Sequence, residues 1–274
     1  MGRLYTFGCS FTSYLWPTWA DIIGTQFDHF ENWGRASFGN QFISQQVVEC
    51  DILNDLGPDD TVVIVWSDHL RWDVVSKWNW TARRIADVDL DLGHFYLISM
   101  SSIYQTIQLL KSKNVKYHMS WLMPLNIDTA DFYKNTITSI YRSQSQLLPF
   151  EKMLHGPNWF TGFEGGVFKY FFENTDRKHF KVWADDTNIR ELFANRVIPE
   201  DSIYVDRHPT PLLHMKWVEY ELADRLGLDV RPMRHQAKLW HKRLMEVPYR
   251  HEVPGEFAKD KSIRPVGITG NITR

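Results

Sequence analysis

An uninterrupted apolar run near residue 60 constrains the fold of this chain more than any other feature. Residues 61–66 read Thr-Val-Val-Ile-Val-Trp, so β-branched side chains follow one another without alternating with polar ones. This pattern is typical of a strand in a parallel sheet whose two faces are both covered by helices. A second apolar run over 3–7 stops at Gly8, as expected for another buried strand that enters a sharp turn.

Signals for strands and helices alternate from residue 3 to residue 123 and return after residue 203. This alternation predicts a three-layer α/β domain with a mostly parallel sheet. The last helix has the clearest boundaries, because Thr210 is a good N-cap, Pro211 fits the first helical position and Gly227 is a typical stop. Its apolar face is predicted to carry Leu213, Trp217 and Tyr220. The other predicted elements are strands over 27–30, about 115–123 and 203–205, and helices over 17–23, about 43–53 and about 94–113.

Two parts of the chain do not continue the alternation. Residues from about 125 to 200 are aromatic and polar, and we interpret them as a helical or irregular insertion in a domain that spans 1–228. Residues 229–274 form a basic extension with ten Lys and Arg against five Asp and Glu. Its four prolines, at 232, 248, 254 and 265, are expected to break it into short pieces. We expect this extension to wrap the domain or a neighbouring subunit, which would make a homo-oligomer.

Composition excludes several classes of protein. The 31 Lys and Arg nearly balance the 33 Asp and Glu, so a wholly basic nucleic-acid binder is excluded. No apolar stretch approaches eighteen residues, and no charged-then-apolar leader precedes the first strand, so we expect a cytoplasmic protein that does not span a membrane. Cys9 and Cys50 lack metal-ligand spacing, and no nucleotide-binding glycine motif is present. These absences argue against a nucleotide-binding protein and a zinc protease.

Residues capable of acyl transfer follow the predicted strands. Ligands bind at the carboxyl ends of strands in parallel α/β sheets, so residues at these points are expected to converge. A serine, an imidazole and a carboxylate are the groups that nucleophilic acyl transfer requires, and a glycine turn can supply N–H donors for an oxyanion. In chain order these residues are Ser10, Gly39 and Asn40, Ser67 with Asp68 and Arg71, and Asp206 with His208.

The same residues, in the same order, resemble the SGNH/GDSL hydrolase family. The shared features are Gly-x-Ser at 8–10, Gly39-Asn40, a polar turn after the third strand, and Asp206 with His208-Pro209. The resemblance covers roughly 3–72 and 203–227, and it implies a flavodoxin-like fold and an esterase, lipase, thioesterase or carbohydrate deacetylase activity. Residues 7–12 and 208–211 also resemble members found in bacterial viruses, which would place the protein in a host cytoplasm or with a virion.

The resemblance implies a role for each matching residue. Ser10 would be the nucleophile and, through its own N–H, one oxyanion donor, and Gly39 would supply a second N–H. His208 would be the general base, with Asp206 as its orienting partner and Asp201 as the weaker alternative. No metal or cofactor is implied.

Three departures from the family pattern concern the site. Cys9 stands where the family has Asp, a residue that is not the base. The third block lacks its Asn, so Ser67 is the matching oxyanion donor and Asn40 is a second candidate. A single residue, Arg207, separates Asp206 from His208, where many members have two.

Tryptophan is abundant, with twelve residues in 274, and several cluster just after the third strand. Aromatic faces stack on sugar rings, so Trp66 and Trp72 are candidate substrate-binding residues; a Trp-rich core is the alternative. Arg71 could bind a substrate carboxylate or phosphate, or pair with Asp68 or Asp73.

Two functions follow from the sequence. The first is a serine hydrolase that cleaves acetyl or short-chain acyl esters, with carbohydrate esters among its candidate substrates. The second is a catalytically weak binding or assembly module on the same fold, such as a phage structural or carbohydrate-binding protein.

Overall fold

The computed structural model describes residues 2–68, 71–76, 79–84, 92–122, 180–183 and 204–248, together with 253 and 257. The first half of the chain contains β1 (Arg3–Gly8), α1 (Trp19–Gly24), β2 (His29–Asn32), α2 (Asn40–Asn54), β3 (Asp60–Trp66), β4 (Arg71–Ser76), β5 (Asn79–Arg84), α3 (Leu92–Ser112) and β6 (Lys116–Trp121). The second half contains β7 (Phe180–Trp183), β8 (Tyr204–Pro209), α8 (Pro211–Trp217), a π-helical turn (Val218–Leu222), α9 (Ala223–Leu226) and α10 (Val230–Glu246).

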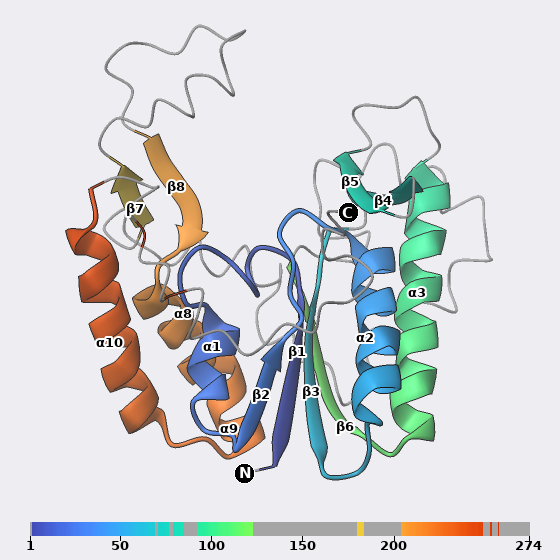
Figure 1. Ribbon diagram of the computed structural model, residues 1–274, viewed down its shortest axis with the longest axis horizontal. Coiled ribbons are helices and arrows are strands. Elements are labelled where there is room, and N and C mark those ends of the chain that lie inside the picture. The colour runs from blue at the N-terminus through green and yellow to red at the C-terminus, as the bar shows by residue number, and fades with distance from the viewer. Residues whose placement is uncertain are drawn as a thin grey trace, which may run out of the picture.

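A parallel four-stranded sheet in the order β2-β1-β3-β6 forms the middle layer (Figure 1). Helices α2 and α3 cover one face, and α1, α8 and α10 lie on the other side of the sheet (Figure 1). These three layers confirm the predicted α/β class with a mostly parallel sheet. Strand β3 lies in the interior of the sheet and is buried along nearly its whole length, which explains its continuous apolar sequence.

Apolar side chains fill the space on both sides of the sheet. Val62 and Ile64 of β3 pack with apolar residues of α2 and α3, and Val63 and Val65 pack on the opposite face with α1 and α8. Successive residues of a strand point to opposite faces, so one apolar run supplies both cores.

The helix after β8 follows its sequence signals with one exception. Thr210 is the N-cap, Pro211 is the first helical residue, and Gly227 ends α9 in the left-handed conformation, with a φ of 64°. Tyr220, however, is 55% exposed and does not share the buried face of Trp217. It lies in the π-helical turn, whose wider winding rotates the residues that follow Trp217.

The last strand differs from its prediction. Strand β8 pairs antiparallel with β7 in a separate two-stranded sheet and does not extend the parallel sheet. It is also longer than predicted, so Asp206 and His208 lie within the strand and not after it. The hairpin of β4 and β5 was not predicted, because its mixed polar and aromatic sequence lacks a clear period.

The basic extension begins with a continuous helix. Pro232 does not break α10, because it lies in the first turn, where a missing N–H costs no intrahelical bond. Asp229 caps this turn by accepting the Arg231 N–H at 3.0 Å, and Pro248 follows the helix end. The helix packs against α8 and α1 of its own chain. The predicted insertion at about 125–200 lies outside the described residues except for 180–183.

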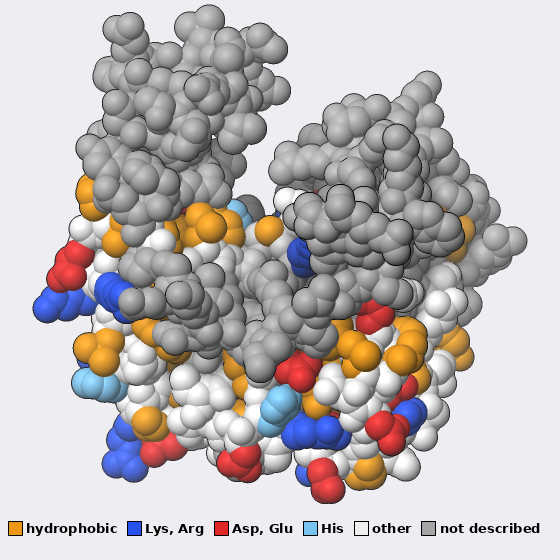
Figure 2. Space-filling view, viewed as in Figure 1, with side chains coloured by type: hydrophobic (Ala, Val, Ile, Leu, Met, Phe, Trp, Pro, Cys, Tyr) orange, Lys and Arg blue, Asp and Glu red, His pale blue; other side chains and the backbone are white. Residues whose placement is uncertain are grey.

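The amino ends and the carboxyl ends of the parallel strands, called here the amino edge and the carboxyl edge of the sheet, lie at opposite ends of the molecule (Figure 1). Acidic, basic and histidine side chains lie side by side at the lower end of the molecule, where the parallel strands begin (Figures 1 and 2). The carboxyl ends of the strands lie at the opposite edge. None of the described helices is both long and apolar enough to cross a bilayer.

Candidate active site

The turn after β1 holds Ser10 in a tight and well-bonded loop. A Cβ at Gly8 would overlap the Thr12 hydroxyl and lie 2.9 Å from the Val65 carbonyl, so only glycine fits there. The Cys9 carbonyl accepts the N–H groups of Thr12 and Ser13 at 2.9 and 3.1 Å. These bonds present Ser10 at the carboxyl edge of the sheet with 7% of its surface exposed, while the neighbouring Cys9 is fully buried.

Asp206 and His208 of β8 form a hydrogen-bonded pair. The His208 Nδ1 lies 2.8 Å from the Asp206 Oδ1, and the same oxygen accepts the His208 backbone N–H at 3.0 Å. A single intervening residue on an extended strand places both side chains on one face, so the shorter spacing than in the family pattern still allows the pair to form. Asp206 is completely buried, and the His208 side chain is 24% exposed.

Aromatic residues of the β1 turn bring this pair to the Ser10 loop. The Tyr14 ring stacks on the His208 imidazole at 3.6 Å between centroids, and the Phe11 ring lies 5.3 Å away on a tilted axis. The Tyr14 hydroxyl donates to the Asp206 Oδ2 at 2.8 Å, across 192 positions of sequence. These contacts place Phe11, the immediate neighbour of Ser10, against the imidazole.

A tryptophan anchors the same two segments. The Trp16 indole N–H donates to the Pro209 carbonyl at 2.8 Å, and the Trp16 ring meets Tyr14 edge-on at 4.5 Å. Trp16 also packs with Leu244 of α10 and with Phe257, so the basic extension supports the site from behind. Sequence reasoning missed Tyr14 and Trp16, because no spacing rule connects an aromatic turn to a strand about 190 residues away.

The local electrostatics favour an ionised Asp206. Burial alone would raise the pKa of Asp206, but the hydrogen bonds and the positive charge of His208, with the bond from Tyr14, hold that pKa below its ordinary value. His214 of α8 is buried behind the site, and burial together with the charge of His208 lowers its pKa to about 3. His214 therefore stays neutral, and the ionised carboxylate faces His208. The described residues hold no cluster of three or more metal-ligating side chains.

The Gly39 N–H is engaged with a residue that sequence reasoning did not place at the site. It donates to Asp73 Oδ1 of β4 at 2.7 Å, and the Phe42 N–H donates to the other carboxylate oxygen at 2.8 Å. A Cβ at Gly39 would lie 2.6 Å from the Arg71 carbonyl, which explains the glycine. Asp73 thus caps the N-terminus of α2, and burial raises its pKa to about 6 despite these two hydrogen bonds.

The other two oxyanion candidates lie below the surface. The Asn40 side chain pairs with the backbone of Ser67, accepting its N–H at 2.7 Å and donating to its carbonyl at 3.1 Å. This pairing fixes the end of β3 against the start of α2. The Ser67 hydroxyl is buried and makes no hydrogen bond within the described part of the chain.

The predicted substrate-binding residues have different outcomes. Trp66 is fully buried in the core under α2 and α3, so its assignment to substrate binding is wrong and the core alternative holds for this residue. Arg71 lies beside the Gly39 turn and donates to the Phe38 carbonyl at 3.4 Å. The side chain of Trp72 and the whole of Asp201 lie outside the described residues.

Comparisons with known proteins add little to this geometry. No protein-family model matches the chain, and no curated protein does. One similar solved structure is a member of the lipolytic protein G-D-S-L family from Veillonella parvula DSM 2008, with a TM-score of 0.40 and 13% identity over 82% of this chain and 100% of that chain. Another belongs to the same family in Desulfitobacterium hafniense DCB-2, with a TM-score of 0.30 and 16% identity over 55% of this chain and 73% of that chain.

Both TM-scores are low. Neither neighbour supports the resemblance to members from bacterial viruses. The function of this chain must therefore be inferred from its own residues.

Proposed function

We propose that this protein is a serine hydrolase that cleaves acyl esters with Ser10 as nucleophile, His208 as general base and Asp206 as the partner of His208. The observation that carries the proposal is the hydrogen-bonded pair of the buried Asp206 and the partly exposed His208, which the rings of Phe11 and Tyr14 contact from the Ser10 turn. A carboxylate bound to Nδ1 fixes the imidazole tautomer and leaves Nε2 to accept a proton.

The proposed reaction gives each of these residues one role. His208 Nε2 takes the proton of the Ser10 hydroxyl while the oxygen attacks the ester carbonyl, which forms a tetrahedral intermediate. The imidazolium then returns that proton to the departing alcohol, and the acyl group remains on Ser10. Water, deprotonated by the same nitrogen, releases the acid and regenerates the serine.

The oxyanion requires N–H donors that point into the site. The Ser10 N–H is bonded to no described residue, so it is the first donor in this proposal. The Gly39 N–H becomes the second donor once Asp73 releases it. Losing one such donor typically lowers the rate by about 10²–10³-fold. In this proposal the rate therefore depends on whether Asp73 keeps its hydrogen bond to the Gly39 N–H.

A small acyl group fits the proposal best. Ser10 is only 7% exposed, and the nearby Phe11 is 5% exposed, so the site favours acetyl or short-chain esters over long acyl chains. A carbohydrate as the alcohol remains part of the proposal through Trp72 and the other tryptophans that follow β3 in the sequence.

Turnover of p-nitrophenyl acetate tests the proposal. The Ser10→Ala variant should lose at least about 10³-fold in kcat/KM, because the residual rate would come from binding and oxyanion contacts alone. Ser112→Ala, a serine at the end of α3, is the matched control and should retain the parent rate. Equal hydrolysis by the parent and the Ser10→Ala variant would rule out Ser10 as the nucleophile.

The second candidate is a binding or assembly module with little catalysis. The bond from Gly39 to Asp73 favours it, because that bond occupies one proposed oxyanion donor. The parent protein would then show no hydrolysis above that of the Ser10→Ala variant.

A further inference from the structure

Tyr14 makes two contacts with the pair that the proposed function uses. Its hydroxyl donates to Asp206 Oδ2 at 2.8 Å, and its ring lies on the His208 imidazole at 3.6 Å with only 17° between the planes. The two contacts reach different members of the pair, so one side chain restrains both.

The hydroxyl of Tyr14 bonds to the carboxylate oxygen that His208 does not contact in the pair. Asp206 Oδ1 accepts two hydrogen bonds from His208, and Oδ2 accepts the bond from Tyr14. Asp206 is fully buried, so removing Tyr14 would take away one of the hydrogen bonds that stabilise its charge away from bulk water. The carboxylate would then be less restrained, and it would rotate more easily out of the position in which Oδ1 bonds to Nδ1.

The ring of Tyr14 restricts the plane of the imidazole. His208 is partly exposed, and its Nδ1 bond alone allows the ring to tilt about that bond. Tyr14 is itself held by the edge contact with Trp16, whose indole is bonded to the Pro209 carbonyl. The stack is therefore part of a fixed aromatic arrangement, and a stacked ring also favours a cationic imidazole while the proton is in transit.

We propose that Tyr14 is a positioning residue that holds Asp206 by its hydroxyl and the His208 ring by its face, so that Nε2 points at Ser10. This inference rests on the proposed function for its catalytic consequence. Tyr14 does not touch the reacting atoms, and it acts through His208.

Two variants separate the two contacts. Tyr14→Phe keeps the ring and removes the bond to Asp206, and it should lower kcat on p-nitrophenyl acetate about tenfold with KM within about twofold. Tyr14→Leu removes both contacts and should lower kcat about a hundredfold. Tyr104→Phe, at an exposed tyrosine on α3, is the matched control and should leave both constants unchanged. If Tyr14→Leu fails to fold, Tyr14→Phe alone decides the matter.

A second readout does not depend on activity. The Nδ1–H proton of His208 should be observable by NMR in the Ser10→Ala protein, and adding Tyr14→Phe should speed its exchange with solvent by about tenfold. Unchanged exchange together with parent kcat would overturn the role of Tyr14 while leaving the hydrolase intact. Faster exchange in a protein whose parent form hydrolyses nothing would keep Tyr14 as the support of His208 and overturn the proposed function instead.

Discussion

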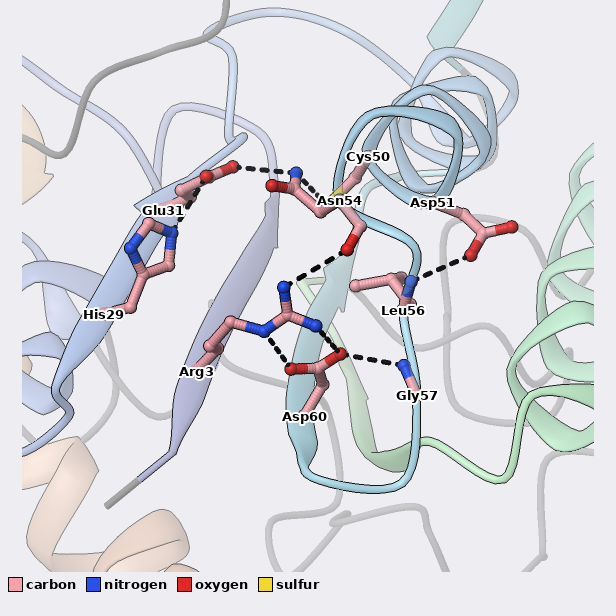
Figure 3. Close-up of polar contacts among 9 residues, drawn as sticks. All are labelled: Arg3, His29, Glu31, Cys50, Asp51, Asn54, Leu56, Gly57 and Asp60. Atoms are coloured by element: carbon pink, nitrogen blue, oxygen red, sulfur yellow. Dashed lines mark hydrogen bonds and ion pairs between the residues drawn. The ribbon is translucent and has the colours of Figure 1, made fainter.

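The two edges of the parallel sheet hold polar clusters of opposite character. At the amino edge, Arg3, His29 and Asp60 are the first residues of β1, β2 and β3, and they lie side by side in the sheet. Glu31 and Asn54 belong to the same polar cluster (Figure 3). At the carboxyl edge lie the Ser10 turn and the pair of Asp206 and His208. The first cluster joins elements that are neighbours in the sheet, whereas the second joins a turn to a strand outside it.

Polar side chains at the amino edge bond mainly to one another. Arg3 makes a two-pronged contact with Asp60 at 2.6 and 2.7 Å, and Asp60 also accepts the Gly57 N–H at 2.8 Å. Glu31 accepts from His29, from the Trp33 indole and from Asn54. Such a network ties β1, β2, β3 and the end of α2 together.

Several buried polar groups at the carboxyl edge have no hydrogen-bond partner among the described residues. The buried hydroxyls of Thr12, Ser67 and Thr210 make no hydrogen bond within the described residues, and neither does the Ser10 N–H. Unpaired buried polar groups cost stability unless water or a ligand bonds to them. The carboxyl edge, which holds Ser10 and the Asp206–His208 pair, is the edge to which the proposed function assigns the chemistry.

The largest expected effect comes from Asp206. Asp206→Asn should keep the shape of the buried side chain but present an amide to Nδ1, so the imidazole takes the wrong tautomer and kcat on p-nitrophenyl acetate falls by about 10³-fold or more. The measurement is steady-state kinetics beside a thermal unfolding curve. An Asp206→Asn enzyme with the parent kcat would show that Asp206 takes no part in catalysis.

The matching change at the amino edge is Asp60→Asn. It replaces a charged acceptor of Arg3 with an amide, and it should lower the free energy of unfolding by about 2 kcal/mol without changing kcat. Urea denaturation gives the first quantity and the esterase assay the second. A fall in kcat in the fully folded variant would show that the amino edge also contributes to catalysis.

A smaller effect concerns Asp73 and pH. Its pKa in the folded protein, about 6, is above the ordinary value of 3.8, so the folded state holds this proton more tightly than the unfolded chain does. Stability from Asp73 is therefore greatest at low pH and declines as the pH rises from about 4 to about 6.

Asp73→Asn removes this titration. Urea unfolding at about pH 4.5 and pH 6.5 should show a smaller difference between the two pH values in the variant than in the parent. The same pH dependence in both proteins would show that Asp73 does not titrate in this range.

The smallest effect is expected from Glu31→Gln. The amide keeps one acceptor for the Trp33 indole and loses the charge beside His29, so the free energy of unfolding should fall by about 1 kcal/mol. A loss as large as that of Asp60→Asn would mean that Glu31, and not the Arg3–Asp60 pair, dominates the amino edge.

The sequence predicts the central part of the fold because its signals are local. The β-branched run of β3 and the cap and stop residues around α8 and α9 act within a few positions. The pairing of Asp206 with His208 was predicted from the resemblance to the SGNH/GDSL family, because the predicted strand over 203–205 ended before both residues.

The remaining features depend on contacts between distant segments. The pairing of β8 with β7, the Tyr14 stack on His208 and the carboxylate of Asp73 at the start of α2 each join residues at least 20 positions apart. The prediction that Pro232 breaks the chain is wrong for a local reason. Its effect depends on where α10 begins, and the sequence did not predict that this helix starts at Val230.

Covalent labelling by a fluorophosphonate tests the central claim most directly, because such a probe reacts with a serine whose proton a neighbouring base removes. The account predicts one adduct per chain, located at Ser10 by peptide mass spectrometry, absent in Ser10→Ala and formed at least about a hundredfold more slowly in His208→Ala. An unlabelled parent protein, or an adduct on Ser10 that forms equally fast without His208, would contradict it.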